Sequence, residues 1–289
     1  MIRRHLLCTL LLTLAGLLPV AAHDAQGAQA PRYRNWLCYY GTDFGPAHYG
    51  RFDLVVLDGM KHPPLERKEP GKPLLLGYVT VGESDPSSPT WMLAQHQSFI
   101  AGKNENWGSL IIDMRSPKWQ GILLDLVIPK VLAQGFDGIF LDTIDSAMAL
   151  AEGKDAAKYE GMRASILGFL RTIRERFPDI HICMNRGLDL LPDAAPIINS
   201  LLIEDLSFEY DFEKKEYRAV PKQVQQALVA AARRGLAANP ELTVLTLDYA
   251  KPDQKARIKE AIDYSRSKGF VPYVSTLALD QVFYHTLDR

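Results

Sequence analysis

The chain has 289 residues, of which 47% are hydrophobic and 23% charged, with 33 basic and 34 acidic side chains. This composition is that of an ordinary globular protein, and it excludes a disordered chain, a collagen-like fibre and a disulfide-dense miniprotein. A formal net charge of −1 offers no basic surface for nucleic acid, so we expect no nucleic-acid partner.

The first 22 residues have the parts of a secretory signal peptide. Arg3 and Arg4 precede an apolar run over residues 6–22 that ends in small residues. The run is shorter than the ~20 apolar residues of a membrane span, which disfavours the alternative of an uncleaved anchor. We therefore expect cleavage near Ala22, no membrane span in the mature chain, and a secreted or periplasmic protein.

Two cysteines, Cys38 and Cys183, remain after cleavage at this point. Both lie in apolar runs that are far apart in the sequence, so we expect two buried free thiols rather than a disulfide.

Eight short apolar runs follow the signal peptide, most of them nearly continuous. Such runs are typical of parallel strands that are buried on both faces. They cover residues 36–40, 54–58, 74–80, 138–142, 181–185, 201–204, 243–248 and 271–275. A ninth run at 110–113 is predicted to be an extra segment inside the long loop after the third strand.

Longer segments with helical periodicity separate these runs. Met162, Ile166, Leu170 and Ile173 recur at steps of three and four, which predicts one apolar helix face. A second helix is predicted over residues 119–134, with a kink at Pro129. Further helices are expected after Pro221 and around residues 258–262, whereas the charged run 213–218 is expected to form a solvated loop.

Alternation of strand and helix eight times predicts a single (β/α)8 TIM barrel of the α/β class over residues 34–289. No linker-like segment divides this region. In such barrels the active site lies at the carboxyl ends of the strands. The candidate site residues at or near these ends are Tyr40, Asp58, Tyr78, Glu83, Asp142, Asp145, Asn185, Arg186, Glu204, Asp248, Tyr249 and Tyr273.

Structural roles compete with catalysis for several acids. Asp137 begins its strand and is expected to stabilise the opposite end of the barrel. Asp145 is as well placed to cap a helix as to bind substrate. Alternation along a strand turns Asp205 away from the side that Glu204 faces, so only Glu204 is expected at the mouth. Asp142 and Glu204 are the strongest catalytic candidates.

Other catalytic chemistries lack their signatures in this sequence. There is no G-x-S-x-G elbow, P-loop or G-x-G-x-x-G fingerprint, and the seven histidines lack zinc-site spacing. We therefore expect neither a cofactor nor a metal, although converging carboxylates leave Mg²⁺ or Ca²⁺ open. Two carboxylates, with no cofactor, are the catalytic groups that a typical glycosidase requires.

Residues 135–145, which read GFDGIFLDTID, resemble a signature of glycoside hydrolase family 114, the endo-α-1,4-polygalactosaminidase-like proteins. Further similar segments follow in the same order at 78–83, 107–113, 184–187, 202–204, 247–249 and 271–275. The hydrolase domain of the Pel-polysaccharide system is similar in layout. The resemblance implies a barrel that cleaves α-1,4-linked galactosamine or N-acetylgalactosamine polysaccharide, with Asp142 and Glu204 as the catalytic carboxylates. Residues 84–89 depart from the family pattern.

The resulting hypothesis is a monomeric, secreted endo-acting glycoside hydrolase with a retaining mechanism. Asp142 would be the nucleophile, kept ionised by Asn185 and Arg186, and Glu204 the general acid/base, its pKa raised by an apolar strand and by Asp142. The alternatives are the same chemistry on a neutral α-linked glycan, and a non-catalytic polysaccharide-binding barrel. Trp91, Trp107 and Trp119 flank the third loop, where packing is favoured over sugar stacking.

Overall fold

The structure, a computed structural model, describes residues 32–66 and 73–287, so the expected signal peptide lies outside the described residues. Eight parallel strands form one sheet in the order β1 (Trp36–Tyr39), β2 (Leu54–Leu57), β3 (Leu74–Thr80), β7 (Gly138–Asp142), β8 (His181–Asn185), β9 (Ser200–Glu204), β12 (Thr243–Tyr249) and β13 (Val271–Ser275). All eight predicted strands are present, and their ends agree to within one residue.

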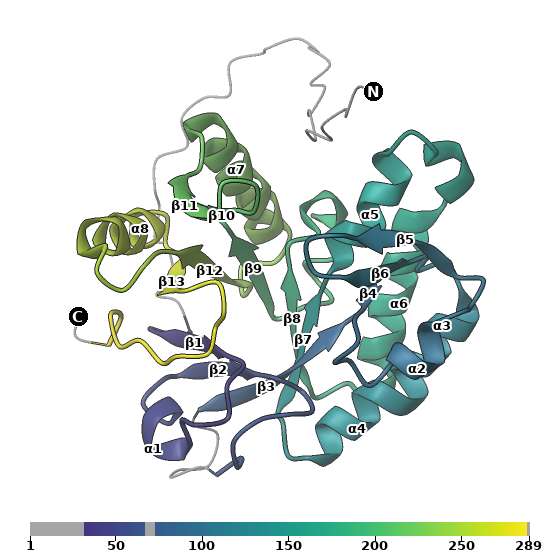
Figure 1. The fold of residues 1–289 in the computed structure, drawn as a ribbon, viewed down its shortest axis with the longest axis horizontal. Coiled ribbons are helices and arrows are strands. Elements are labelled where there is room, and N and C mark those ends of the chain that lie inside the picture. Colours follow the sequence, from purple (N-terminus) through teal and green to yellow (C-terminus); the bar gives the residue numbers. More distant parts are fainter. Residues whose placement is uncertain (1–31, 67–72, 288–289) are drawn as a thin grey trace.

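The sheet curves into a nearly closed barrel, as the sequence predicted. Its two edge strands approach each other, because the rings of Trp36 on β1 and Tyr273 on β13 lie 5.8 Å apart between centroids. Beyond these strands, the backbone N–H of Tyr40 donates to the carbonyl of Leu279 at 2.7 Å. Figure 1 shows the strands in the middle of the molecule and the longer helices around them.

Four of the outer elements are long enough to cover the barrel. They are α5 (Ile144–Glu152), α6 (Met162–Arg176), α7 (Lys222–Ala238) and α8 (Lys255–Ser267). In α6 the predicted face of Met162, Ile166, Leu170 and Ile173 is fully buried. Burial of such an apolar face, rather than intrinsic helix propensity, supplies most of the stability of a helix of this length.

The helix predicted over residues 119–134 is continuous but irregular. It begins as α3 (Pro117–Ile122), passes through a π-helical turn over Leu123–Val127 and ends as α4 (Ile128–Ala133). Pro129 lies in the first turn of α4. Because proline has no N–H, it cannot continue the i→i−4 pattern, and the wider π turn precedes it.

Two connections are shorter than strand–helix alternation predicted. Between β8 and β9 the chain forms only a 3-10 turn at Leu188–Leu190, and between β1 and β2 only the single-turn helix α1 (Pro46–Tyr49). The barrel therefore has eight strands without eight full crossover helices.

The segment 213–218, predicted to be a solvated loop, contributes to a hairpin instead. β10 (Phe208–Asp211) pairs antiparallel with β11 (Glu216–Ala219). Arg218 on β11 bridges Glu209 at 2.7 Å and Asp211 at 2.9 Å on β10. These cross-strand charge pairs favour pairing in a segment whose composition suggested only solvation.

The ninth apolar run is a strand of a small inserted sheet, in agreement with the prediction of an extra segment after β3. β6 (Ser109–Ile112) lies between β4 (Glu83–Ser84) and β5 (Ile100–Asn104), and both pairs are antiparallel. A one-turn helix, α2 (Trp91–Ala94), connects β4 to β5. This insertion follows the carboxyl end of β3 and so stands at the mouth of the barrel.

Two further expectations for the scaffold hold, those for the cysteines and for Asp137. Cys38 and Cys183 are buried free thiols. Asp137 accepts a hydrogen bond from the backbone N–H of Leu75 at 2.8 Å, at the amino ends of β3 and β7. Within the described ranges, no helix is long and apolar enough to cross a membrane.

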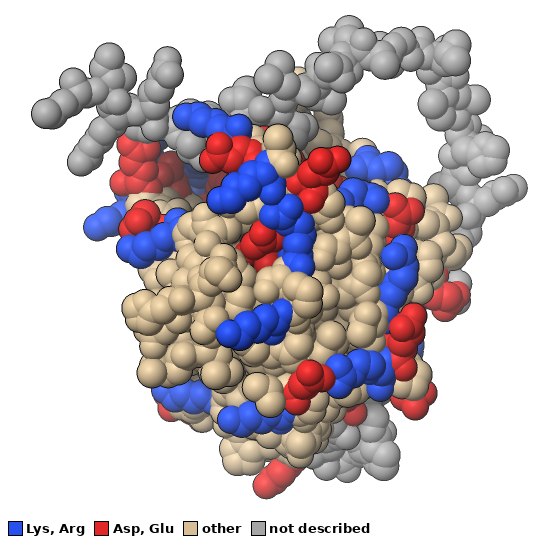
Figure 2. Space-filling model, turned by 90° about the vertical axis from the view of Figure 1, so that its right-hand side faces the viewer, with Lys and Arg blue, Asp and Glu red and all other residues tan. Residues whose placement is uncertain are grey.

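On the face drawn in Figure 2, basic and acidic side chains are interspersed around a broad uncharged area.

Candidate active site

A cavity of about 650 Å³ opens at the carboxyl ends of the barrel strands. Ten of the twelve candidate residues line it: Tyr40, Asp58, Tyr78, Glu83, Asp142, Asp145, Asn185, Arg186, Glu204 and Tyr249. They come together because parallel strands place their carboxyl ends at one edge of the sheet. The cavity has the size of an ordinary small-ligand site.

Asp142 and Glu204 are joined at the centre of this cavity by one side-chain amide. Asn185 Nδ2 donates to Asp142 Oδ1 at 2.8 Å and to Glu204 Oε2 at 2.9 Å. These two oxygens therefore cannot be farther apart than the sum of the two distances, 5.7 Å. The three residues end the consecutive neighbours β7, β8 and β9, so the sheet itself sets their spacing.

Two tyrosines hold the outer oxygens of the pair. Tyr78 Oη donates to Asp142 Oδ2 at 2.9 Å, and Tyr249 Oη donates to Glu204 Oε1. Tyr40 lies edge-to-face against Tyr78, with ring centroids 5.2 Å apart. Each carboxylate thus receives one hydroxyl and one amide N–H, both neutral donors, which fix its orientation without neutralising its charge.

The three strands that carry Asp142, Asn185 and Glu204 leave the barrel in the same way. The residue after each has a left-handed backbone, with φ of 65° at Thr143, 55° at Arg186 and 59° at Asp205. Residues other than glycine rarely adopt this conformation, and such positions gather at functional sites. The turn ends the strand alternation abruptly at the level of the two carboxylates.

This backbone turn overturns the expectation that Asp205 faces away from the mouth. Asp205 lines the cavity together with Glu204, because its positive φ breaks the two-residue alternation. Arg186 lies between Asp205 and Asp145, with N···O distances of 3.5 Å and 3.6 Å. Arg186 is therefore paired with these two acids, whereas Asn185 alone of the two expected partners contacts Asp142.

Burial and mutual repulsion dominate the electrostatics of the site. Desolvation, followed by the charge of Glu204, raises the pKa of Asp142 to about 7. The same two causes raise the pKa of Asp205 well above its ordinary value. Two carboxylates held this closely in a low-dielectric site repel each other, so the charge of Glu204 disfavours ionisation of Asp142.

Glu83 and Asp58 also line the cavity, and hydrogen bonds from the protein hold both carboxylates in place. Glu83 is buried and accepts hydrogen bonds from Asn104 at 3.0 Å, Ser146 at 2.5 Å and the hydroxyl of Ser109. Asp58 accepts from two backbone N–H groups in the turn after β2, at 2.7 Å and 2.8 Å.

The structure does not bring Asp248 and Tyr273 to the cavity. Asp248 is fully buried, and its Oδ1 accepts from the backbone N–H of Ser207, in the turn between β9 and β10, and from that of Phe208, the first residue of β10. Tyr273 is buried against Trp36, and its hydroxyl accepts from the N–H of Phe283 at 3.2 Å. Both residues are buried, and neither lines the cavity.

Three aromatic residues of the site were missed or assigned to packing from sequence. Trp107 is 57% exposed and lines the cavity together with Tyr210 and Phe212. The alternation Phe208, Tyr210, Phe212 with acids between them is a strand signal that could have identified the hairpin. Trp119 does pack, because it is buried and its Nε1 donates to the carbonyl of Val81 at 2.7 Å.

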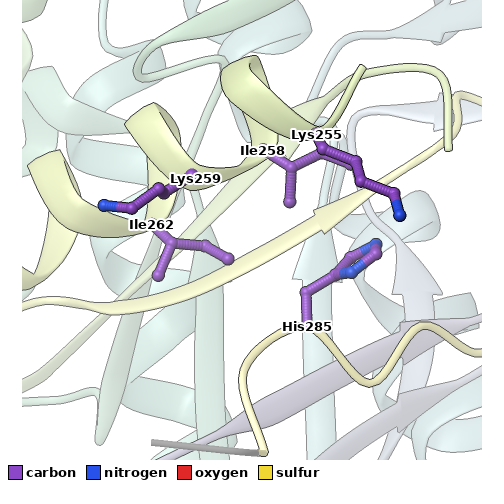
Figure 3. A pocket seen from close by; sticks show the side chains of 5 residues that line it. All are labelled: Lys255, Ile258, Lys259, Ile262 and His285. Carbon is purple, nitrogen blue, oxygen red and sulfur yellow. The ribbon is translucent and has the colours of Figure 1, made fainter. Parts of the chain in front are cut away.

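Among the described residues, no group of three or more His, Cys, Asp or Glu side chains is arranged to hold a metal ion. A second cavity, of about 350 Å³, lies between α8 and the C-terminal segment and is lined by Lys255, Ile258, Lys259, Ile262 and His285 (Figure 3). It is lined by no carboxylate and shares no residue with the barrel mouth. Of these two cavities, the larger one is therefore the candidate for catalysis by carboxylates.

Comparison with known proteins points to one family. The model of glycoside hydrolase family GH114 matches residues 18–288. An uncharacterised protein of Deinococcus radiodurans is 26% identical over 254 residues, which cover 84% of this chain and 79% of that protein. An uncharacterised protein of Thermotoga maritima is 24% identical over 72% of this chain and 67% of its own length.

Two solved structures share the fold. The glycoside hydrolase domain of PelA from Pseudomonas aeruginosa is 28% identical and has a TM-score of 0.75, with 86% of this chain and 97% of that domain covered. Aspergillus fumigatus Ega3, solved in complex with galactosamine, is 13% identical with a TM-score of 0.64, covering 89% of this chain and 96% of that one. The match of the family model over nearly the whole chain, on a barrel with paired carboxylates at its mouth, shows that this protein belongs to glycoside hydrolase family GH114.

Proposed function

We propose that this glycoside hydrolase cleaves α-1,4-linked galactosamine or N-acetylgalactosamine polysaccharide internally, by a retaining double displacement. The observation that carries the proposal is the bridging of Asp142 and Glu204 by the amide of Asn185 at the mouth of the barrel. Asp142 is the nucleophile that attacks the anomeric carbon, and Glu204 is the general acid/base.

The separation of the two carboxylates supports retention. Retaining glycosidases hold their carboxyl groups ~5–5.5 Å apart, whereas inverting enzymes need ~6.5–9.5 Å to admit a water molecule. The upper limit of 5.7 Å between Asp142 Oδ1 and Glu204 Oε2 fits the first geometry. In the first step Glu204 protonates the leaving oxygen as Asp142 bonds to the sugar. In the second step Glu204 deprotonates the water that releases the sugar from Asp142.

The hydrogen-bonding neighbours suit these roles. Tyr78 and Asn185 supply neutral donors to Asp142, so its charge stays available for attack and its orientation is fixed. Burial and the charge of Glu204 raise the pKa of Asp142, and the hydrogen bonds from Asn185 and Tyr78 oppose this rise, so they favour the ionised form that nucleophilic attack requires. Arg186 does not compete for Asp142, because it is paired with Asp145 and Asp205.

The charge of the cavity favours an amino-sugar polymer. Its described lining includes seven carboxylates, Asp58, Glu83, Asp85, Asp142, Asp145, Glu204 and Asp205, against a single basic residue, Arg186. A cavity of this sign concentrates polymers with free ammonium groups and repels uronic acids. The galactosamine bound to Ega3, a protein of the same fold, agrees with this substrate class.

Export is proposed from the sequence. We infer that residues 1–22 are a signal peptide, that residues 34–289 form the hydrolase domain, and that the mature protein acts as a monomer outside the cytoplasm. N-terminal sequencing of the exported protein should begin near His23, and a chain that keeps residues 1–22 would refute the cleavage.

The proposed activity is tested by incubating the purified protein with partly deacetylated α-1,4-galactosamine polymer and analysing the products by mass spectrometry. We expect a ladder of oligosaccharides from the wild type and none from Asp142→Asn. Release of single sugars alone would contradict internal cleavage. Cleavage of a neutral α-galactan in place of the amino-sugar polymer would contradict the substrate class, and binding without any cleavage would indicate a non-catalytic barrel.

A further inference from the structure

Two hairpins meet above the barrel mouth through aromatic side chains. Trp107 lies in the turn between β5 and β6, and Phe212 in the turn between β10 and β11. Their rings are edge-to-face, with centroids 5.4 Å apart. Phe212 contacts Tyr210 in the same way at 5.2 Å. The hairpins follow β3 and β9, so the two insertions come from different sectors of the barrel and make contact over the site.

These aromatic rings are exposed where an ordinary globular protein would bury them. The large hydrophobic side chains that are exposed in the described part of the chain are Met92, Leu93, Trp107, Leu126, Phe212 and Val224. The aromatic members of this set are Trp107 and Phe212, and these two also line the cavity, whereas the four aliphatic ones do not. Exposed apolar surface that gathers at a cavity rim marks a binding site more often than a packing defect.

The chemistry of this cluster matches a sugar ring. A hexopyranose presents a face of C–H groups, whose positive polarisation complements the negative face of an aromatic ring. A free ammonium group on the same sugar adds attraction to that face. The Trp107 and Phe212 rings meet edge-to-face, so the edge of one ring contacts one face of the other. This contact leaves at least one face of each ring uncovered by the other ring.

We propose that Trp107 and Phe212 form an outer subsite that binds a sugar unit of the polymer away from the scissile bond. This inference rests on the proposed function. The subsite makes affinity depend on chain length, because a substrate must span from the Asp142–Glu204 pair to the rim to gain this contact. It gives the hairpins β5–β6 and β10–β11 the role of selecting polymer over short oligosaccharides.

The proposal is tested with Trp107→Ala, Phe212→Ala and Trp107→Phe. Leu126→Ala is the matched control, because Leu126 is 55% exposed, close to the exposure of Trp107, and does not line the cavity. Initial rates are measured on the galactosamine polymer and on a monomeric aryl galactosaminide, which reaches only the central carboxylates. Melting temperature reports whether each variant remains folded.

We expect KM for the polymer to rise about five- to tenfold in each alanine variant, with partial recovery in Trp107→Phe. The loss of kcat/KM on the polymer should exceed the loss on the aryl glycoside at least about fivefold. A polymer KM equal to that of Leu126→Ala, or equal losses on both substrates, would overturn the subsite. If Trp107→Ala unfolds, Phe212→Ala decides the question.

A binding measurement separates failure of the subsite from failure of the proposed function. Titration calorimetry of galactosamine oligomers into Glu204→Gln should show affinity that rises with oligomer length, and the added Trp107→Ala substitution should abolish the rise. Length-dependent binding by this protein, with no cleavage by the wild type, would refute the hydrolase function and support the subsite. Cleavage without length dependence would refute only the subsite.

Discussion

Asp142 and Glu204 accept hydrogen bonds from the same amide nitrogen, that of Asn185. Because the three residues end adjacent parallel strands, the distance between the carboxylates is set by the barrel and not by a mobile loop. The left-handed residue that follows each of them then turns the chain away at the same level. The site is thereby built on rigid elements, which is the arrangement that precise positioning requires.

Removal of either carboxylate should abolish turnover without unfolding the chain. Asp142→Asn and Glu204→Gln keep the shape of each side chain and one of its acceptor oxygens, and we expect each to lower kcat by several orders of magnitude. Asp253→Asn, at an exposed acid outside the cavity, is the matched control and should have no effect. Azide should restore turnover to Asp142→Ala with an inverted glycosyl azide as product, and formation of the inverted glycosyl azide by Glu204→Ala instead would reverse the assigned roles.

Asn185→Ala should move the acidic limb of the pH–rate profile upward. The hydrogen bond from Asn185 lowers the pKa of Asp142, so its loss lets that pKa rise further above about 7. A hydrogen bond to a charged group is worth ~1.5–3 kcal/mol, which corresponds to a shift of about one unit or more. Because the nucleophile must be ionised, the activity at neutral pH should fall. An unchanged acidic limb of kcat/KM would contradict this role for Asn185.

The pH dependence of stability should also reveal the raised pKa of Asp142. A carboxyl whose pKa is raised on folding stabilises the native state fully below its unfolded value, here 3.8, and loses this contribution as the pH rises to about 7. Asp142→Asn removes the charge, so its Tm relative to wild type should increase between about pH 4 and pH 8, by roughly 3 °C or more. A Tm difference between variant and wild type that is constant across this pH range would show that folding does not raise the pKa of Asp142.

Asp248 should prove structural. Asp248→Ala removes the acceptor of the backbone N–H groups of Ser207 and Phe208, at the entry to β10, and leaves these donors buried. We expect the free energy of unfolding to fall by ~2–4 kcal/mol, with KM for the polymer little changed at a temperature where the variant is folded. A raised KM at unchanged stability would restore the substrate-binding role that the sequence suggested.

Salt should weaken the action on a cationic polymer. The excess of carboxylates in the cavity lining attracts ammonium groups, and this attraction is screened at high ionic strength. Between 0.05 and 0.5 M salt we expect kcat/KM on partly deacetylated polymer to fall about three- to tenfold, and less on fully acetylated material. Cleavage of polygalacturonate at a comparable rate would contradict the electrostatic argument.

The barrel could be predicted because parallel strands buried on both faces leave uninterrupted apolar runs, and the strand ends then indicated where Asp142, Asn185 and Glu204 converge. The errors arose where local geometry departs from regular alternation. Asp205 reaches the mouth through a positive φ that no residue type announces, since aspartate tolerates this conformation without requiring it.

Other differences depend on tertiary contacts. Asp248 follows the same apolar pattern as Asp142, and only the position of the β9–β10 turn makes it a buried acceptor. Likewise, the charged segment that includes Arg218 becomes strand β11 because Glu209 and Asp211 lie opposite it. The pKa of Asp142 is raised because the closed barrel desolvates its carboxyl, and that burial depends on strands far apart in the sequence.

The most direct test of the central claim is the configuration of the first-formed product, followed by proton NMR during hydrolysis of the α-linked galactosamine polymer. A pair of carboxylates as close as Asp142 and Glu204 leaves no room for a water molecule between nucleophile and sugar. We therefore expect the new reducing end to appear first as the α-anomer and to convert to the β-anomer by mutarotation. Initial appearance of the β-anomer would contradict the nucleophilic role of Asp142.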